Sequence, residues 1–308
     1  MENTRAKTTR NSLILLLTAT IWGMAFVSQS KGMDYMHPFT FNGVRSLIGA
    51  AGILVYILIS RKIAGDKAAK LDWKLNVRAG LLCGIFLTIA STLQQFGIKY
   101  TSVGKAGFIT TLYIIFVPMF GIFLKKKVAP VVWAAASMAA VGMYLLCMTE
   151  SLRLGAGDIM VFLCAIAFAI QIMTVDHYAA RIDGAVVSCI QFTVCGVVCC
   201  IGALIWGQPT FGQIQEGLGA LLYAGVLSCG VGYTLQIVGQ KGLNPTVAAL
   251  IMSLESVIAT ISGWIAYKIG FLSTDQTLTP RQIAGCVIVF AAVILVQLPP
   301  EWFRFGKK

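Results

Sequence analysis

The chain has 308 residues, of which 57% are hydrophobic and 12% are charged, and its formal net charge is +12. A soluble domain could not keep this much apolar side chain away from water. The composition therefore excludes an ordinary water-soluble protein and predicts an integral membrane protein.

Ten apolar stretches follow one another along the chain. Each is long enough to cross a hydrocarbon core of about 30 Å, which requires a helix of about 20 residues. We expect helices, because backbone groups in lipid must be satisfied within their own segment and the stretches lack the alternation of barrel strands. Ser102 is expected to cap the fourth span, and Asn244 with Pro245 to begin the ninth. The predicted spans cover residues 12–30, 38–60, 77–98, 103–124, 128–148, 158–178, 185–206, 218–238, 246–269 and 281–298.

Most Lys and Arg residues lie in segments that these spans place on the same side as the N-terminus. This asymmetry predicts that both termini are cytoplasmic, with residues 1–10 and 299–308 as tails. We expect a multi-pass protein of a prokaryotic plasma membrane. Topology and attraction to membrane lipids explain the positive charge, so nucleic-acid binding is not expected.

An internal repeat divides the chain. TLQQFGIK at residues 92–99 returns as TLQIVGQK at residues 234–241, an offset of 234 − 92 = 142, and at an offset of 146 Arg45 is aligned with Gln191. We predict two five-helix repeats, at residues 11–149 and 155–298. Five spans are an odd number, so the second repeat enters the membrane inverted. Inverted repeats recur in secondary transporters, where they surround a central cavity and permit alternating access. A duplication that merely builds a stable bundle is the alternative.

Four sequence segments carry a family resemblance: IWGMAFV in the first span, FNGVRSLIGA in the second, TSVGKAGFITTLY at the fourth and LNPTVAALIMSLESV in the ninth. Together they resemble the drug/metabolite transporter superfamily, EamA type, over about 290 residues. The resemblance implies ten helices in two repeats around a central cavity, moving small metabolites, often outward. Two departures are Ser256, where the second repeat often has proline, and Phe168, where Trp is common. The first removes the usual reason for a kink in the ninth span.

Two ionisable residues lie deep within predicted spans, where a charge costs at least about 2.5–3.5 kcal/mol. Glu255 is interpreted either as a carboxylate that binds substrate or couples transport to protons, or as a structural partner for Arg45 or for helix hydroxyls. Arg45 could hold a carboxylate or phosphate with its planar guanidinium group, or brace two helices. Facing one cavity, the pair would suit a zwitterion such as an amino acid.

Neutral polar and aromatic residues at similar depth complete the predicted substrate site. Amides can both donate and accept hydrogen bonds, which suits selectivity, although they can also join helices. The further candidates are Trp22, Gln94, Thr110, Tyr113, Gln171, Gln191, Gln236 and Ser256. The nine cysteines are interpreted as packing residues, no metal or cofactor is expected, and Lys105 is expected to anchor a helix end at the interface.

The sequence therefore predicts a secondary active or facilitative transporter of small polar metabolites, such as an amino acid or a related compound. Export is expected from the resemblance, and proton coupling through Glu255 and facilitated exchange are both open. A transporter or flippase for drugs or lipid-like amphiphiles is the alternative. The sequence has no nucleotide-binding motif and no intramembrane catalytic constellation, so we expect neither a pump driven by nucleotide hydrolysis nor an enzyme. A monomer is expected, with a dimer as the alternative.

Overall fold

The computed structural model describes residues 2–65, 71–124, 130–147, 155–273 and 275–297, and within these ranges every regular element is helical. Eight helices there are long and apolar enough to cross a membrane, and two shorter apolar helices cover Pro130–Gly142 and Pro280–Leu295. The predicted all-α membrane fold is confirmed at this level. The first half contains α1 (Glu2–Gly32), α2 (Pro38–Ala64), α3 (Trp73–Ile98), α4 (Val103–Thr111), α5 (Tyr113–Phe123) and α6 (Pro130–Cys147).

The second half mixes α-helical with π-helical segments, which are wider and carry the symbol η. Both π segments lie in predicted spans, η2 in the seventh and η3 in the eighth, where only regular helix was expected. The elements are α7 (Ala156–Tyr178), α8 (Gly184–Gly202), η2 (Ala203–Gly207), α9 (Phe211–Glu216), α10 (Leu218–Leu222), η3 (Tyr223–Gly232), α11 (Tyr233–Gly239), α12 (Pro245–Met252), α13 (Glu255–Lys268) and α14 (Pro280–Gln297).

The expected helix starts at the fourth and ninth spans are present. The Ser102 hydroxyl accepts a hydrogen bond from the backbone N–H of Lys105, and the Asn244 side chain accepts one from Thr246, with Pro245 in the first turn. At the N-terminus, α1 begins at Glu2, so residues 2–10 of the expected cytoplasmic tail are helical and continue into the first span. The expected tail at 299–308 and residues 149–154, at the junction of the two predicted repeats, lie outside the described residues.

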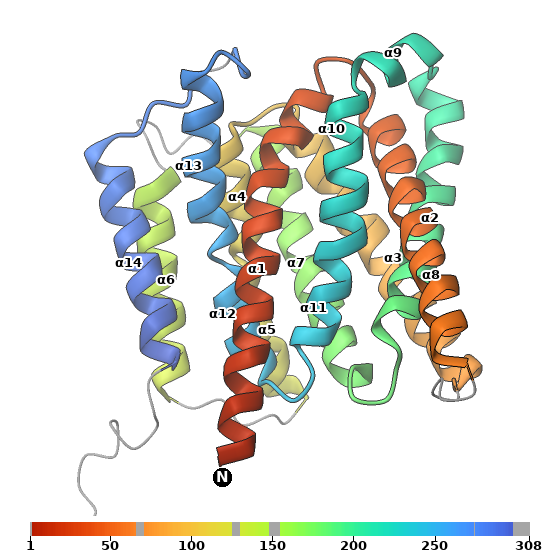
Figure 1. Ribbon diagram of the computed structural model, residues 1–308. Helices are drawn as coiled ribbons and strands as arrows, with labels where there is room; N and C mark the ends of the chain where they lie inside the picture. The colour runs from red at the N-terminus through yellow and green to blue at the C-terminus, as the bar shows by residue number, and fades with distance from the viewer. Residues whose placement is uncertain (1, 66–70, 125–129, 148–154, 274, 298–308) are drawn as a thin grey trace, which may run out of the picture.

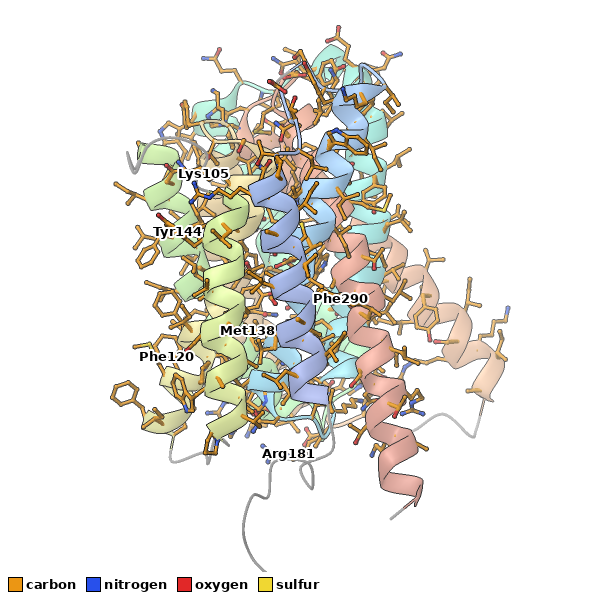
Figure 2. All side chains as sticks on the ribbon, turned by 90° about the vertical axis from the view of Figure 1, so that its left-hand side faces the viewer. Lys105, Phe120, Met138, Tyr144, Arg181 and Phe290 are labelled. Atoms are coloured by element: carbon orange, nitrogen blue, oxygen red, sulfur yellow. The ribbon has the colours of Figure 1, made fainter. Side chains whose placement is uncertain are left out.

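The helices stand side by side, and the N-terminus lies at the same end of the molecule as the end of α14 (Figure 1). α6 and α14 pack against each other at the periphery. A Cβ added at Gly142 would lie 2.9 Å from the carbonyl oxygen of Gly285, so this pair depends on a close approach of two backbones. Figure 2 views this pair from outside, with Tyr144 and Phe290 on its surface. These rings are 42% and 54% exposed, as expected for side chains that face lipid.

Both the fourth and the ninth spans are interrupted near their middle. The first interruption separates α4 from α5 at Leu112, and the second separates α12 from α13 at Ser253 and Leu254. Leu112 and Leu254 are 254 − 112 = 142 residues apart, which equals the repeat offset. The ninth span is thus broken without the missing proline. Ser253 and Ser256 donate their hydroxyl hydrogen bonds to the carbonyl oxygens of Leu250 and Ser253, at 2.7 and 2.8 Å, which helps a helix to bend.

Lys105 does more than anchor a helix end. Its ammonium group forms an ion pair with Asp158 Oδ2 at 2.6 Å, and the Asp158 side chain is only 4% exposed. Thr101 donates a second hydrogen bond to Oδ1 of the same carboxylate at 2.9 Å. This cluster ties the start of α4 to the start of α7, at the end of the molecule opposite Arg181 (Figure 2).

Candidate functional site

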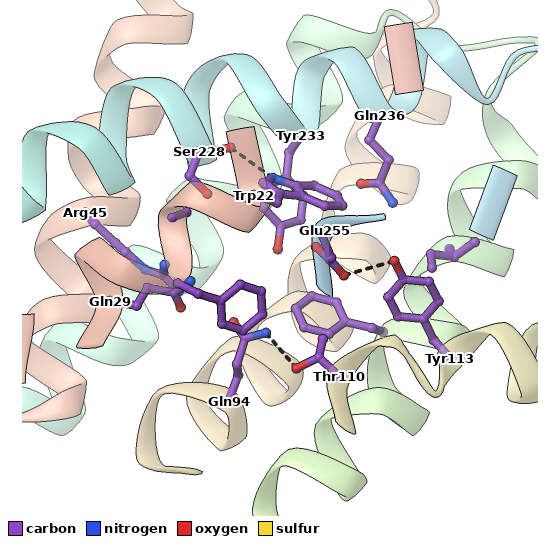
Figure 3. Close-up of a pocket in the computed structure, with 14 residues that line it drawn as sticks. Trp22, Gln29, Arg45, Gln94, Thr110, Tyr113, Ser228, Tyr233, Gln236 and Glu255 are labelled. Atoms are coloured by element: carbon purple, nitrogen blue, oxygen red, sulfur yellow. Dashed lines mark hydrogen bonds between the residues drawn. The ribbon is translucent and has the colours of Figure 1, made fainter. Parts of the chain in front are cut away.

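A small cavity lies at the centre of the bundle, where side chains from both halves of the chain converge (Figure 3). The cavity has a volume of about 30 Å³, which is room for roughly two water molecules. Pockets for small molecules are usually about 300–1,000 Å³, so a metabolite requires the helices to move apart. The lining residues are Trp22, Ala25, Phe26, Gln29, Arg45, Gln94, Thr110, Tyr113, Phe168, Ile172, Ser228, Tyr233, Gln236 and Glu255.

Arg45 brings a buried positive charge to this cavity. It is 5% exposed, its Nε donates to Asn42 Oδ1 at 2.9 Å, and its guanidinium carbon lies 5.4 Å from the centre of the Phe41 ring. Asn42 is itself fixed by a hydrogen bond from its side-chain nitrogen to the carbonyl oxygen of Ser91, at 2.9 Å. Among the described residues Arg45 has no carboxylate within ion-pair distance. The hydrogen bond from Nε fixes the position of the guanidinium group, and its positive charge is available to bind an anionic group of a ligand.

Glu255 brings the opposite charge, from the first residue of α13. It is 3% exposed, and its Oε1 accepts a hydrogen bond from the Tyr113 hydroxyl at 2.9 Å. Neither Arg45 nor any other cation in the described part of the chain pairs with it. Of the two structural partners expected for Glu255, the structure therefore shows a hydroxyl and not Arg45. A charge on this carboxylate is compensated locally only by a neutral hydroxyl, and a proton or a substrate cation could supply the missing positive charge.

The two interrupted spans meet at this hydrogen bond. Tyr113 and Glu255 each follow the break in their span, and they are 142 residues apart in the sequence. The residues that carry the contact therefore occupy equivalent positions of the internal repeat. Helix breaks leave backbone groups without their usual partners, and in membranes such breaks are tolerated where they face a cavity or other protein.

Aromatic rings form another part of the wall. The rings of Trp22 and Tyr233 lie 4.5 Å apart between centroids, and the Tyr233 ring also meets Phe192 edge-on at 5.0 Å. The indole N–H of Trp22 points to the carbonyl oxygen of Ser228 in η3, at 3.4 Å. The wall therefore offers flat apolar surface close to both charged groups (Figure 3).

Two equivalent amides contribute hydrogen-bonding groups. Gln94 donates to Thr110 Oγ1 at 3.2 Å, and Gln236, its counterpart at the 142 offset, donates to Gln171 Oε1 at 3.2 Å. In the described structure the buried side-chain amide oxygens (Oε1) of Gln29 and Gln236 have no hydrogen-bond partner. Since an unsatisfied buried group costs about 1–3 kcal/mol, these oxygens are suited to a donor on a ligand or on water.

Three predicted site residues do not line the cavity. Gln171 lies behind it and supports Gln236. Gln191 is fully buried and neither of its amide atoms has a partner among the described residues. Ser256 faces α4, where a Cβ on Gly107 would lie 3.5 Å from the Ser256 Cα. The remaining seven predicted residues converge on the cavity: Trp22, Arg45, Gln94, Thr110, Tyr113, Gln236 and Glu255.

Sequence reasoning missed half of the cavity lining. Ala25, Phe26 and Gln29 follow Trp22 at spacings of three, four and seven residues, which is one face of a helix. Tyr233 precedes Gln236 by three residues and shares its face in the same way. These spacings could have identified the additional residues once Trp22 and Gln236 were chosen. Phe168 follows Trp22 by 168 − 22 = 146 residues, the second repeat offset, and Ile172 follows Phe168 by four, so these two also carried a signal. Ser228 carried no comparable sequence signal.

Gly23 permits α1 to approach α13 at the edge of the site. A Cβ at this position would lie 2.5 Å from Ile258 Cβ and 2.8 Å from the Glu255 carbonyl oxygen. The glycine next to Trp22 therefore sets the distance between the aromatic wall and the carboxylate. No group of three or more His, Cys, Asp or Glu residues with metal-binding geometry occurs in the described ranges, and the cavity lining offers none.

Comparisons with known proteins agree with this architecture. The model of the EamA-like transporter family matches residues 10–148 and again residues 155–298. An uncharacterized transporter of Archaeoglobus fulgidus is 27% identical over 290 residues, which is 92% of this chain and 84% of the relative. The uncharacterized transporter YwfM of Bacillus subtilis is 24% identical over 295 residues, 94% of either chain. One crystal structure has a TM-score of 0.74 and covers 96% of this chain and 99% of its own, at 16% identity, which shows a shared fold.

Proposed function

The chain belongs to the EamA-like transporter family, and from this premise we propose that it is a secondary active or facilitative transporter of a small polar metabolite, an amino acid or a related compound. The observation that carries this proposal is a buried Arg45 and a buried Glu255 that line one cavity without pairing with each other. A zwitterion would satisfy both charges, with its carboxylate on the guanidinium group and its ammonium group on the carboxylate. Trp22 and Tyr233 would cover its apolar part.

The mechanism that we propose is alternating access by two inverted five-helix repeats, residues 11–149 and 155–298. Two equivalent contacts between the halves support this mechanism. In each contact, a glycine near the end of the third helix of one repeat packs against the first helix of the other repeat. A Cβ on Gly97 would clash with a side-chain carbon of Val161, and one on Gly239 would lie 2.7 Å from a side-chain carbon of Leu15. Gly239 follows Gly97 by 142 residues, and Val161 follows Leu15 by 146, so the two contacts are the same contact made twice. This is the pattern expected of two halves that can exchange conformations.

We further propose that the protein is a monomeric exporter of a prokaryotic plasma membrane, has both termini in the cytoplasm and is not an enzyme. The N-terminus and the end of α14 lie at one end of the molecule (Figure 1). Arg61, Lys62, Arg181 and Lys241 lie near this same end, in agreement with the distribution of basic residues at cytoplasmic helix ends. Because two repeats complete the cavity within one chain, a single copy suffices for transport.

The test is uptake from a pooled metabolite mixture into proteoliposomes, read by mass spectrometry, with and without an imposed pH gradient. We expect saturable accumulation of a few zwitterionic compounds, and loss of that accumulation in both Arg45→Gln and Glu255→Gln. Arg78→Gln and Glu216→Gln remove exposed charges of the same kinds and should transport normally. Normal transport by both site variants would rule out the charge-pair recognition. If hydrophobic drugs or lipids moved in place of polar compounds, the amphiphile transporter would be the correct reading.

A gradient effect distinguishes the two coupling modes. If Glu255 carries a proton, an imposed pH gradient should drive accumulation by the unaltered protein, while any residual flux of Glu255→Gln should be insensitive to the gradient. Flux that is independent of the gradient in both proteins would identify facilitated exchange.

A further inference from the structure

A second cavity system lies outside the central site, along the surface between α2 and the continuous segment formed by η3 and α11. It has a section of about 410 Å³ at the level of mid-α2 and a section of about 630 Å³ toward the C-terminal end of α2. Tyr56, Thr234 and Val238 line both sections, so the two form one continuous groove. Its volume is far larger than that of the central cavity, and none of its lining residues reaches the central site.

The groove begins where two helices in close contact diverge. At Gly49 in α2, a Cβ would lie 2.7 Å from Cys229 Cβ and 2.8 Å from the Gly225 carbonyl oxygen of η3. One turn later, a Cβ at Gly52 would meet no atom within 4 Å. The walls beyond this point include Ile53, Gly52 and aliphatic side chains of η3 and α11. This section therefore offers an apolar channel that is open to lipid and that no side chain in the described part of the chain fills.

The wide end of the groove carries an excess of positive charge, with three cations against two carboxylates. Arg61, Arg181 and Lys241 line it together with Asp72 and Asp183. Both aspartates are occupied as helix caps: Asp72 accepts from the backbone N–H of Leu75, and Asp183 from the N–H groups of Ala185 and Val186. In the described structure none of the three cations lies within ion-pair distance of a carboxylate. Lys241 and Arg181 each donate one hydrogen bond to a backbone carbonyl oxygen, of Ile182 at 3.2 Å and of His177 at 3.4 Å, so their charges are not neutralised. An anionic group would complement this end.

The length of the groove fits one half of a membrane. Gly49 and Arg61 are 12 positions apart on α2, which at about 1.5 Å per residue corresponds to roughly 18 Å. One leaflet contributes about half of a hydrocarbon core that is about 30 Å thick. The apolar section thus begins near the middle of the bilayer, and the basic section lies at the depth of the head groups.

We propose that this groove is a binding site for one anionic phospholipid, with its phosphate over Arg61, Arg181 and Lys241 and one acyl chain in the section between Gly49 and Tyr56. The charge of the wide end selects the head group, and the divergence of α2 from η3 makes room for the chain. The lipid occupies the leaflet at the N-terminal end of the molecule. The site is separate from the substrate cavity, so it stands whether or not the proposed substrate is correct.

Native mass spectrometry of the full-length protein in detergent tests the head-group half of the proposal. Phosphatidylglycerol should bind in a 1:1 complex more tightly than phosphatidylcholine with the same acyl chains. Arg61→Ala combined with Lys241→Ala should weaken phosphatidylglycerol binding by about fivefold for each charge removed. Lys62→Ala combined with Lys74→Ala removes two nearby cations that do not line the groove, and should change binding little. Equal binding of the two lipids, or equal loss in the two double variants, would overturn the proposal.

A glycine pair tests the acyl-chain half. Gly52→Leu fills the groove without meeting another atom at its Cβ, whereas Gly219→Leu adds the same side chain at an equally open position of α10. Only Gly52→Leu should weaken phosphatidylglycerol binding, and thermal unfolding without lipid should show both variants folded. Unchanged binding by Gly52→Leu contradicts the proposal. Full competition by the water-soluble head group glycerophosphoglycerol would assign the groove to a free phosphate compound rather than to a lipid. A protein dimer that is lost in Gly52→Leu would assign the groove to a second copy of the chain.

Discussion

Tyr113 and Glu255 show at the scale of single residues how the two halves of the chain are joined. Each occupies the same repeat position, and the hydroxyl of one donates to the carboxylate of the other at 2.9 Å. In the proposed inverted arrangement, a contact between equivalent positions lies on the axis that relates the halves. It can therefore persist when the halves exchange conformations. We infer that this hydrogen bond is a pivot rather than a gate, with its free acceptor capacity directed to the cavity.

Tyr113→Phe should lower the free energy of unfolding by about 1–3 kcal/mol, because it leaves the buried Glu255 without its donor. Thermal or denaturant unfolding in detergent measures this. Tyr144→Phe removes the hydroxyl of a ring on the outer surface and should be nearly neutral. If Tyr113→Phe and Tyr144→Phe have the same free energy of unfolding, the Tyr113 hydroxyl does not stabilise the carboxylate, and the proposal that this hydrogen bond is a pivot is wrong.

At the scale of elements, backbone contact at glycine sets the positions of the helices around the cavity. α1 touches α13 at Gly23, α3 touches α7 at Gly97, and α1 touches α11 at Gly239. A membrane helix is apolar on most sides, so hydrophobic periodicity does not specify which faces meet, and small residues that permit close packing take over this role. The interruptions at Leu112 and Ser253 then place polar side chains of both spans in the cavity.

Gly23→Leu should impair both folding and transport, since its side chain must displace Ile258 and the backbone at Glu255. Overpacking of this kind typically costs about 1–3 kcal/mol. Gly219→Leu is the matched control, because its Cβ meets no atom within 4 Å, and it should leave stability unchanged or slightly higher. Unfolding midpoints and proteoliposome uptake would be compared. Wild-type uptake by Gly23→Leu would show that the α1 to α13 distance does not define the site.

For the whole molecule, the Lys105 and Asp158 ion pair joins the two halves at one end of the bundle. Asp158 is buried and also accepts hydrogen bonds from Thr101 and from the backbone N–H of Gly155. The central cavity has room for only roughly two waters, so substrate entry requires the halves to separate at one end or the other. Opening at this end would break the Lys105 contact.

Asp158→Asn should speed amide hydrogen exchange at the starts of α4 and α7, because it removes the charge that holds these two ends together. The exposed pair Lys31 and Asp34 offers a control at 3.0 Å, with the Asp34 side chain 50% exposed. Asp34→Asn should change exchange little, since exposed pairs contribute only about 0–1 kcal/mol. If Asp158→Asn leaves amide hydrogen exchange at the starts of α4 and α7 unchanged, this ion pair does not hold the Lys105 end of the bundle closed.

The sequence by itself determined that this is an all-helical membrane protein, where its apolar helices lie and that Arg45 and Glu255 are buried. Composition and segment length suffice for these features, because they follow from the thickness and polarity of the bilayer. Only the tertiary structure decided which polar groups meet. In the tertiary structure Glu255 accepts a hydrogen bond from Tyr113 and does not pair with Arg45. Gln191 and Ser256 lie outside the cavity, whereas Gln29 and Tyr233 line it. A groove also lies beside α2. These outcomes depend on the rotation and crossing of helices, which close backbone contacts set and apolar patterning leaves unspecified.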